Sequence, residues 1–460
     1  MTAAPLGLGW PPARALAAPR ARAYGRTVIH VMLSGGADLR HLFTPYPYTS
    51  KKYAAKFWEA RKSLYTTAYP NYVALFNDLY RGVDTGSRKF GIHNKAGWLA
   101  AQYRAGNVAI VANVLGSDNR RHDHSRLIVN TGDPFAKQYI NDRDGWGGRL
   151  VYAIGAAKAV EVSENVSVFC QGTNAANRIA KVVHVSDSRN LALASVGSNP
   201  KSPRSAMARA LKAYYARKRI DVADKPADWP YRKFLRHEQE LRTFGDVVEQ
   251  RMAAVARNQP TGVSNLYTAG SGSTLDNPQF GKQCANVYDS FLAADLFQMR
   301  AVSMEYPQWD THRYQQTGFE ANIEDLFGGG KAFARLTYEL DRLGVWRDTV
   351  CVFATDFGRQ LRANGQRGTD HGRGNYMIIV GPGVRGGVYG EMFPASEIQG
   401  SQGETRYDQI GADIEGRTSF DRVLAEVCDW VEPGTGAKVF PHAAGSMLEP
   451  GVDLGWLFRS

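Results

Sequence analysis

Short apolar runs that end near a glycine recur along the chain. The first spans 27–33, reads TVIHVML and is followed by Ser-Gly-Gly, and similar runs cover 108–115, 349–354 and 376–380. A continuous apolar run of roughly four to eight residues bounded by glycine is typical of a strand buried on both faces. We therefore expect a sheet that is covered on both sides, with a further short strand around 301–305.

Amphipathic stretches alternate with these runs. The segment 97–105 reads GWLAAQYRA and stops at Gly106, and the segment 331–343 has apolar residues at helical spacing and stops at Gly344. Each stretch is followed closely by one of the apolar runs. Alternation of helices and strands in this way is the sequence pattern of an α/β protein with a parallel sheet.

The chain changes character between about 200 and 280. It is charged and has the pattern of helices there, and it then becomes rich in Gly, Ser and Asn. We interpret this region as a helical insertion that caps a single domain spanning 26–460, rather than as an independent domain.

The first 25 residues are rich in Ala, Pro and Arg and hold no acidic residue. They include the tripeptide Ala21-Arg22-Ala23, which has the small-x-small pattern of a cleavage site. Two interpretations stay open for residues 1–25, the remnant of an export signal or a disordered tail. No stretch approaches the roughly twenty apolar residues that span a bilayer, so we expect no transmembrane segment.

The composition favours a folded protein with anionic partners. Apolar residues make up 43% of the chain and charged residues 22%, which is ordinary for a globular protein. The net charge of +12 favours phosphate or sulfate esters, acidic polymers or anionic membranes. The basic residues are scattered, and we find no zinc-finger spacing, RNA-recognition motif or helix-turn-helix. We therefore expect no sequence-specific binding of nucleic acid; the sequence leaves the oligomeric state open.

The four cysteines lie far apart and form no CxxC pair. Cys351 lies within an apolar run and is expected to be a core residue. Cys170 and Cys284 either pair, if the protein occupies an oxidising compartment, or stay reduced.

Acidic and histidine side chains gather at the expected carboxyl ends of strands and in the loop after the third of them. They are Asp38, Asp310, His312, Asp356, Asp370 and His371. The carboxyl ends of parallel strands meet at one edge of a sheet, and carboxylates and imidazoles are ligands of divalent metal ions. Residues two apart in an extended segment face the same side, so Asp310 and His312 can hold one ion together. The alternative interpretation keeps these residues as helix caps and as partners of nearby arginines.

The loop between Asp356 and Asp370 is basic. Its arginines Arg359, Arg362 and Arg367 can clamp a tetrahedral oxyanion through paired hydrogen bonds. They can equally neutralise acidic metal ligands. For Arg359, which follows the strand end directly, we favour neutralisation.

Four motifs resemble, in order, the landmarks of domain-of-unknown-function family 1501 (DUF1501), a family usually placed in the alkaline phosphatase/sulfatase superfamily. They read LSGGADLRHLFTPYP, QWDTHRYQQ, ATDFGRQLRANGQRGTDHG and GPGVRGGVYG, and the resemblance covers about 27–440. It implies a three-layer αβα sandwich with a largely parallel central sheet. It also implies a bacterial protein that is exported to the periplasm or secreted, or a cytoplasmic one if the N-terminus is genuine.

The superfamily resemblance further implies a two-metal site. Asp310, His312 and His371 correspond to the ligands of one ion, and Asp38 and Asp356 to those of the other. Asp370 either ligates or orients its neighbour. Zinc is the expected ion, with calcium, magnesium and manganese as alternatives.

The chain departs from the superfamily pattern at two places. Phe357 stands where many members carry a metal-binding His, so one ligand of the second ion is missing. Arg121-His122 occupies the register where relatives commonly carry Ser-His. The nucleophile is therefore either Ser117, at the end of a strand, or Ser125, which lies in a segment rich in histidine.

The histidines of this segment leave alternatives open as well. His122 and His124 either bind metal or act as acid and base, because imidazole titrates near neutrality. The plainer alternative is a basic helix start on the surface. Substrate binding is assigned to Arg121, Arg359 and Arg367.

The pattern and the resemblance together favour a metal-dependent hydrolase of phosphate or sulfate esters. The alternative hypothesis is a non-catalytic exported protein of the same fold that binds an acidic polymer or a partner in envelope assembly or secretion. The substituted His and the unassigned nucleophile motivate this alternative, since a fold by itself does not establish an activity.

Overall fold

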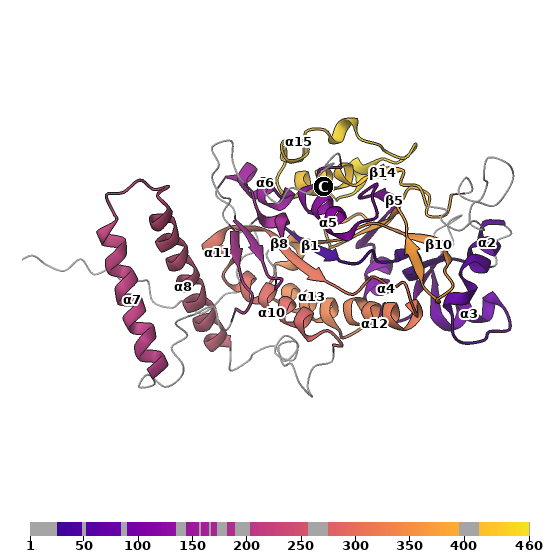
Figure 1. Ribbon diagram of the computed structural model, residues 1–460, viewed down its shortest axis with the longest axis horizontal. Helices are drawn as coiled ribbons and strands as arrows, with labels where there is room; N and C mark the ends of the chain where they lie inside the picture. Colours follow the sequence, from indigo (N-terminus) through magenta and orange to yellow (C-terminus); the bar gives the residue numbers. More distant parts are fainter. Residues whose placement is uncertain are drawn as a thin grey trace, which may run out of the picture.

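The computed structural model describes residues 25–47, 52–83, 90–134, 144–155, 158–164, 167–172, 182–188, 203–255, 275–394 and 414–459, and Figure 1 shows their arrangement. Residues 1–24 of the segment interpreted as a signal remnant or tail lie outside the described residues. Most of the Gly/Ser/Asn-rich stretch lies outside them as well. Within the described ranges, no helix combines the length and apolar character needed to cross a membrane.

A nine-stranded sheet forms the centre of the molecule. Its strands lie in the order β13-β5-β12-β9-β1-β8-β6-β7, and β14 pairs with β5. They are β1 (Thr27–Leu33), β5 (Val108–Leu115), β6 (Lys158–Glu161), β7 (Val182–His184), β8 (Met299–Tyr306), β9 (Thr349–Thr355), β12 (Asn375–Val380), β13 (Gly387–Tyr389) and β14 (Thr418–Ser419). All pairs are parallel except those of β12, which is antiparallel to β5 and β9. The predicted, largely parallel central sheet is confirmed.

The central strand β1 is apolar apart from Thr27 and His30 because both of its faces are covered. Ile29 and Val31 belong to the core on one side of the sheet, and Val28 and Met32 to the core on the other. All seven residues of the strand are buried. Each buried side chain of this size stabilises the fold by roughly 1.5–3 kcal/mol.

Helices cover both faces of the sheet, which confirms the predicted three-layer sandwich (Figure 1). The core on one face includes α4 (Gly97–Arg104), α10 (Pro278–Leu292), α12 (Gln315–Phe327) and α13 (Ala332–Arg342). The core on the other face includes α5 (His122–Thr131), α6 (Trp146–Ile154), α14 (Phe420–Val431) and α15 (Gly436–Val439).

Smaller elements extend the sandwich at one end, where α2 and α3 lie (Figure 1). An antiparallel sheet in the order β2-β4-β3 and a hairpin of β10 and β11 belong here. The strands are β2 (Phe43–Pro45), β3 (Tyr80–Val83), β4 (Phe90–His93), β10 (Arg359–Ala363) and β11 (Thr369–His371), and the helices α1 (Leu39–Leu42), α2 (Lys52–Arg61) and α3 (Tyr72–Leu79). The remaining short helices are η2 (Lys62–Leu64), η3 (Val168–Cys170), α11 (Ala294–Phe297), η5 (Trp346–Asp348), η8 (Ala443–Gly445) and η9 (Leu454–Trp456).

Two long helices occupy part of the region 200–280 and project from the opposite end of the molecule (Figure 1). They are α7 (Pro203–Asp221) and α8 (Pro230–Val255). Phe244 and Val248 of α8 are buried in the sheet core, whereas Met207 and Tyr214 of α7 are exposed. The last part of α8 therefore anchors the pair to the sandwich.

All four cysteines are buried and free. Cys170 belongs to the core on one face of the sheet and Cys284 to the core on the other. The disulfide considered from the sequence is therefore not formed, because the sheet separates the two thiols. Burial raises the pKa of every cysteine thiol, which keeps these side chains protonated.

Candidate metal centre

Six acidic and histidine side chains meet at the carboxyl edge of the central sheet. Four elements supply them: the start of α5, the loop after β8, the end of β9, and β11. The side chains are His122, Asp310, His312, Asp356, Asp370 and His371. Loops that leave parallel strands at this edge converge, which explains why residues far apart in the sequence become neighbours.

The Nε2 atoms of two imidazoles each lie close to that of a third, His371. The Nε2 atom of His371 lies 3.1 Å from that of His122 and 2.8 Å from that of His312. Oδ1 of Asp310 lies 3.1 Å from His312 Nε2 and 3.3 Å from His371 Nε2, and Oδ2 lies 3.5 Å from His122 Nε2. We call these four residues, His122, Asp310, His312 and His371, the His/Asp centre.

The Nδ1 atom of each imidazole faces an oxygen that can only accept a hydrogen bond. This oxygen belongs to an ionised carboxylate or to a backbone carbonyl. Nδ1 of His122 lies 2.7 Å from Oδ2 of Asp356, and Nδ1 of His312 lies 3.2 Å from Oδ1 of Asp370. Nδ1 of His371 lies 2.9 Å from the backbone oxygen of Arg120. Each Nδ1 therefore carries the proton in the neutral ring, and each Nε2 offers a lone pair.

Convergent lone pairs are the arrangement that a metal ion requires. Three Nε2 atoms and a carboxylate have no donor between them, so they repel one another unless a cation or an added proton lies among them. Burial and the charge of Arg359 both lower the pKa of His371, which disfavours the added proton there. Histidine ligands whose other nitrogen donates to a carboxylate or a carbonyl are the usual pattern at protein metal sites. The donor set thus fits a divalent ion.

Arg359 holds Asp310 in place. Its buried guanidinium donates to the backbone oxygens of Gly36 and Thr369, at 2.7 and 2.9 Å, and to Oδ1 of Asp310 at 2.5 Å. Burial raises the pKa of the Asp310 carboxyl, but the hydrogen bond and charge of Arg359 and the neighbouring histidines outweigh it, so the pKa is lowered. Asp310 stays ionised, and the donor groups of Arg359 are directed to the protein itself.

Asp38 does not join the other predicted ligands. It is buried, and its Oδ2 accepts hydrogen bonds from Arg61 and, at 2.7 Å, from Nε2 of Gln315. Asp356 instead accepts from the backbone amide of Gly35 and from His122. Asp370 accepts a hydrogen bond of 3.0 Å from the side-chain amide of Asn364. This bond and the contact with His312 lower the pKa of Asp370, although burial opposes them.

The two candidate nucleophiles lie side by side and bond each other. Ser117 and Ser125 are both buried, and Oγ of Ser125 donates to Oγ of Ser117 at 3.1 Å. Asn119 bonds both hydroxyls, and its amide also lies 3.3 Å from Nδ1 of His124. Within the part of the chain that the structure describes, neither hydroxyl bonds a residue of the His/Asp centre.

The remaining predicted arginines lie on the surface. Arg121 is exposed and pairs with Asp123 at 2.9 Å. Arg367 is also exposed, in a left-handed backbone conformation with φ of 59°. Both belong to loops that border the centre, through Arg120 on one side and Asp370 on the other.

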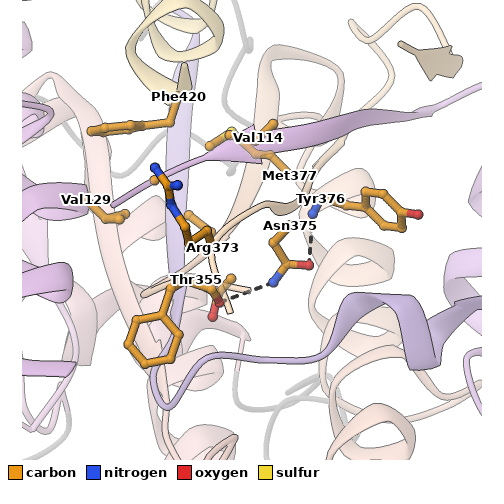
Figure 2. Close-up of a pocket in the computed structure, with 11 residues that line it drawn as sticks. Val114, Val129, Thr355, Arg373, Asn375, Tyr376, Met377 and Phe420 are labelled. Carbon is orange, nitrogen blue, oxygen red and sulfur yellow. Dashed lines mark hydrogen bonds between the residues drawn. The ribbon is translucent and has the colours of Figure 1, made fainter. Parts of the chain in front are cut away.

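Phe357 packs where a metal-binding His was expected. Its ring centroid lies 4.8 Å from that of His122 and 4.5 Å from that of His371. It also lines a mostly apolar pocket of about 300 Å³, a volume that includes the opening. Figure 2 shows Val114, Val129 and Phe420 around this pocket, with the Arg373 side chain among them. Phe357 is therefore a wall shared by the pocket and the centre.

The turn after β1 brings the backbone close to this wall. A Cβ atom on Gly35 would lie 2.5 Å from the backbone nitrogen of Asp310, and one on Gly36 would lie 2.7 Å from the Phe357 ring. Both glycines have positive φ, 120° and 72°. The Ser-Gly-Gly sequence is thus a signal for close packing behind the centre that sequence reasoning used only as the end of a strand.

The fold and the centre define an α/β protein with a histidine–carboxylate cluster at the carboxyl edge of its sheet. The chain belongs to the DUF1501 family: the model of that family, described as "Protein of unknown function (DUF1501)", matches residues 25–401. No curated protein matches the chain.

Among solved structures, the chain is similar to phosphonate monoester hydrolase SpPMH from Silicibacter pomeroyi. The two are 11% identical, and the match covers 88% of this chain and 73% of the other with a TM-score of 0.35. A similarity of this size carries no weight in the assignment of function, which has to come from the site itself.

Proposed function

We propose that this chain is a metal-dependent hydrolase that cleaves phosphate or sulfate esters. The observation that carries the proposal is the convergence of three imidazole Nε2 atoms and the Asp310 carboxylate, each imidazole oriented by a bond at its Nδ1. Structural caps and surface ion pairs give no reason for the Nε2 atoms of His122 and His312 to point at that of His371.

Zinc is the ion that this donor set favours. Imidazole-rich sites with one carboxylate suit zinc, whereas magnesium and calcium prefer oxygen ligands. The superfamily resemblance implies two ions, but Arg61 and Gln315 already bond the Asp38 carboxylate on which the second would depend. We therefore propose one ion, held by the four residues of the His/Asp centre.

A bound ion would polarise the ester oxygen and make a water molecule acidic. The side chains of the protein hold and orient this chemistry. Asp356 and Asp370 keep the Nδ1 protons of His122 and His312, so that Nε2 faces the ligand position. Asp310 and His312 are the more open members, with side chains 45% and 38% exposed, and they give the ester its approach.

Water is the proposed nucleophile. Ser117 and Ser125 are buried and bond each other, so neither hydroxyl is free to attack an ester at the centre. The ring of Phe357 closes one side of the centre against solvent. The net charge of +12 favours the approach of an anionic ester.

The test combines metal content with turnover. Purified protein should contain stoichiometric zinc and hydrolyse at least one nitrophenyl phosphate diester, phosphate monoester, phosphonate or sulfate. His371→Ala should lose the ion and the turnover together, because it removes the imidazole that faces both of the others. His442→Ala, a change at an exposed histidine outside the centre, is the matched control and should keep both.

Two outcomes would change the conclusion. Protein that lacks a metal ion, or that keeps full turnover after His371→Ala, contradicts the proposal. Protein that holds zinc but hydrolyses none of these esters favours the alternative, a non-catalytic exported protein that binds an acidic polymer or an envelope or secretion partner. The buried serine pair, whose hydroxyls bond each other, is the observation behind that alternative.

A further inference from the structure

A second group of possible metal ligands is buried away from the His/Asp centre. It consists of His41 in α1, His93 at the end of β4 and Glu320 in α12. One ligand atom from each lies within 4.8 Å of the other two. The side chain of His93 is fully buried and that of Glu320 is 12% exposed. Three segments far apart in the sequence thus bring two imidazoles and one carboxylate to one place.

The ring nitrogens of His41 have no hydrogen-bond partner among the described residues. The residue is fully buried. Buried polar atoms almost always have a hydrogen-bond partner, because an unpaired one loses its hydrogen bonds to water and gains none in the protein, which costs free energy. Aromatic rings of Tyr65 and Phe319 pack around it, at centroid distances of 5.6 and 5.1 Å, and supply no acceptor or donor to its nitrogens.

His93 and Glu320 already form half of such a site. Nε2 of His93 lies 3.3 Å from Oε1 of Glu320. The Lys95 amide lies 3.3 Å from Nδ1 of His93. An ion at Nε2 would shift the His93 proton to Nδ1 and replace this long contact.

From this arrangement we infer that His41, His93 and Glu320 form a second, structural metal site that takes zinc. Two imidazoles and one carboxylate are a donor set that zinc uses in proteins. The ion satisfies one of the two unbonded nitrogens of His41 and ties α1, β4 and α12 together. Nothing in this site depends on the activity proposed for the His/Asp centre.

The position of the site gives the ion a structural purpose. α1 begins directly after Asp38, and α12 begins three residues after His312. A hydrogen bond of 2.7 Å from Gln315 to Asp38 already joins the starts of these two helices. An ion one turn further along would lock the same two helices to the small sheet.

The first experiment removes the exposed centre and keeps the buried site. The double variant His122→Gln/His371→Gln is expressed in medium supplemented with zinc and purified as the full chain. It should retain one zinc per chain by elemental analysis, and X-ray absorption at the zinc edge should show imidazole and carboxylate ligands. A double variant that is folded by circular dichroism and holds no zinc overturns the inference.

The second experiment changes the buried site alone. Glu320→Gln and, separately, His93→Gln should each lose one zinc equivalent per chain and lower the melting temperature, while the ion of the His/Asp centre stays. His30→Gln, at another fully buried histidine, is the matched control and should lose no zinc. Full zinc retention in both Glu320→Gln and His93→Gln contradicts the site.

Failure of this inference is distinguishable from failure of the proposed function. If the buried site alone binds zinc, the wild type holds one ion, which His93→Gln removes and His371→Gln does not. If only the His/Asp centre binds zinc, His371→Gln removes the ion and His93→Gln does not, and the inference is wrong.

Discussion

Each imidazole of the His/Asp centre is oriented by a hydrogen bond at Nδ1, the nitrogen that faces away from the centre. The three residues are His122, His312 and His371. Asp356, Asp370 and the backbone oxygen of Arg120 hold these three nitrogens. Bonds of this kind set the tautomer and the ring orientation, so the metal affinity proposed for the centre would depend on residues that need not touch the ion.

Asp356→Asn tests this dependence. The amide keeps the size of the carboxylate but lowers its strength as an acceptor and can donate into His122, which favours the wrong tautomer. We expect zinc affinity to fall about 10–100-fold, measured by competition with a chelating dye. Asp123→Asn, next to His122 in sequence and outside the centre, should leave the affinity within about twofold; equal losses in both variants would contradict the role of Asp356.

The turn at Gly35 gives a prediction for stability. Gly35→Ala places a methyl group 2.5 Å from the Asp310 backbone nitrogen, at a φ of 120° that alanine rarely adopts. We expect a loss of about 2 kcal/mol or more in the free energy of unfolding, measured by denaturant titration, together with weaker metal binding. Gly318→Ala in α12 meets no atom within 4 Å and should be neutral or stabilising. Equal stability of the two variants would show that Asp310 moves freely.

Sequence reasoning selected, as candidate metal ligands, five of the six side chains that lie together at this sheet edge, but not the contacts that each of them makes. Asp310, His312, Asp356, Asp370 and His371 come together as neighbours because strand ends converge, which is a property of the fold class. Asp38 is hydrogen-bonded by Arg61, which lies 23 positions further along the chain, and no local sequence pattern predicts this pair. A backbone oxygen that orients His371 has none either, since every residue carries one.

At the scale of elements, the apolar runs located the strands well. Thr27–Leu33 and Val108–Leu115 are the observed bounds of β1 and β5. Strands that are buried on both faces are mostly apolar along their whole length, so the apolar run marks both ends. The orientation of β12 was beyond the sequence. A buried strand has the same pattern in either direction, and only its partners, β5 and β9, define it as antiparallel.

A histidine in the middle of β1 makes the stability of the sandwich depend on pH. His30 is fully buried between the rings of Trp146 and Phe169, and its Nε2 lies 3.0 Å from Oδ1 of Asn130. Burial lowers its pKa from 6.5 to about 4, an effect that the hydrogen bond only partly opposes.

The unfolded chain therefore binds a proton at this histidine between about pH 6.5 and 4, whereas the folded chain does not. Stability from this residue is complete above pH 6.5 and is lost as the pH falls to about 4, by at most about 3 kcal/mol. Denaturant titrations of wild type and His30→Gln at several pH values should show a steeper decline in the wild type. Parallel curves would contradict the assignment.

At the scale of the whole molecule, the net charge of +12 should act on substrate capture. Raising the ionic strength from about 0.05 to 0.5 M shortens the Debye length from about 14 to 4 Å. We expect KM for a dianionic ester to rise several-fold, roughly 3–10-fold, with little change in kcat, because screening weakens attraction and not the chemical step. Steady-state kinetics in sodium and in potassium chloride should agree; a KM that ignores salt would contradict this role of the charge.

The partners of β1 also govern how the protein can be made. Val28 pairs with Ala301 on one side and with Val350 on the other, so the first strand of the sheet finds its neighbours only after most of the chain has been synthesised. Contacts of such long range close slowly, and an unpaired apolar strand is prone to aggregation until they do. The nascent chain therefore passes through a long stage in which a chaperone can hold it unfolded, and the His/Asp centre forms only when that stage ends.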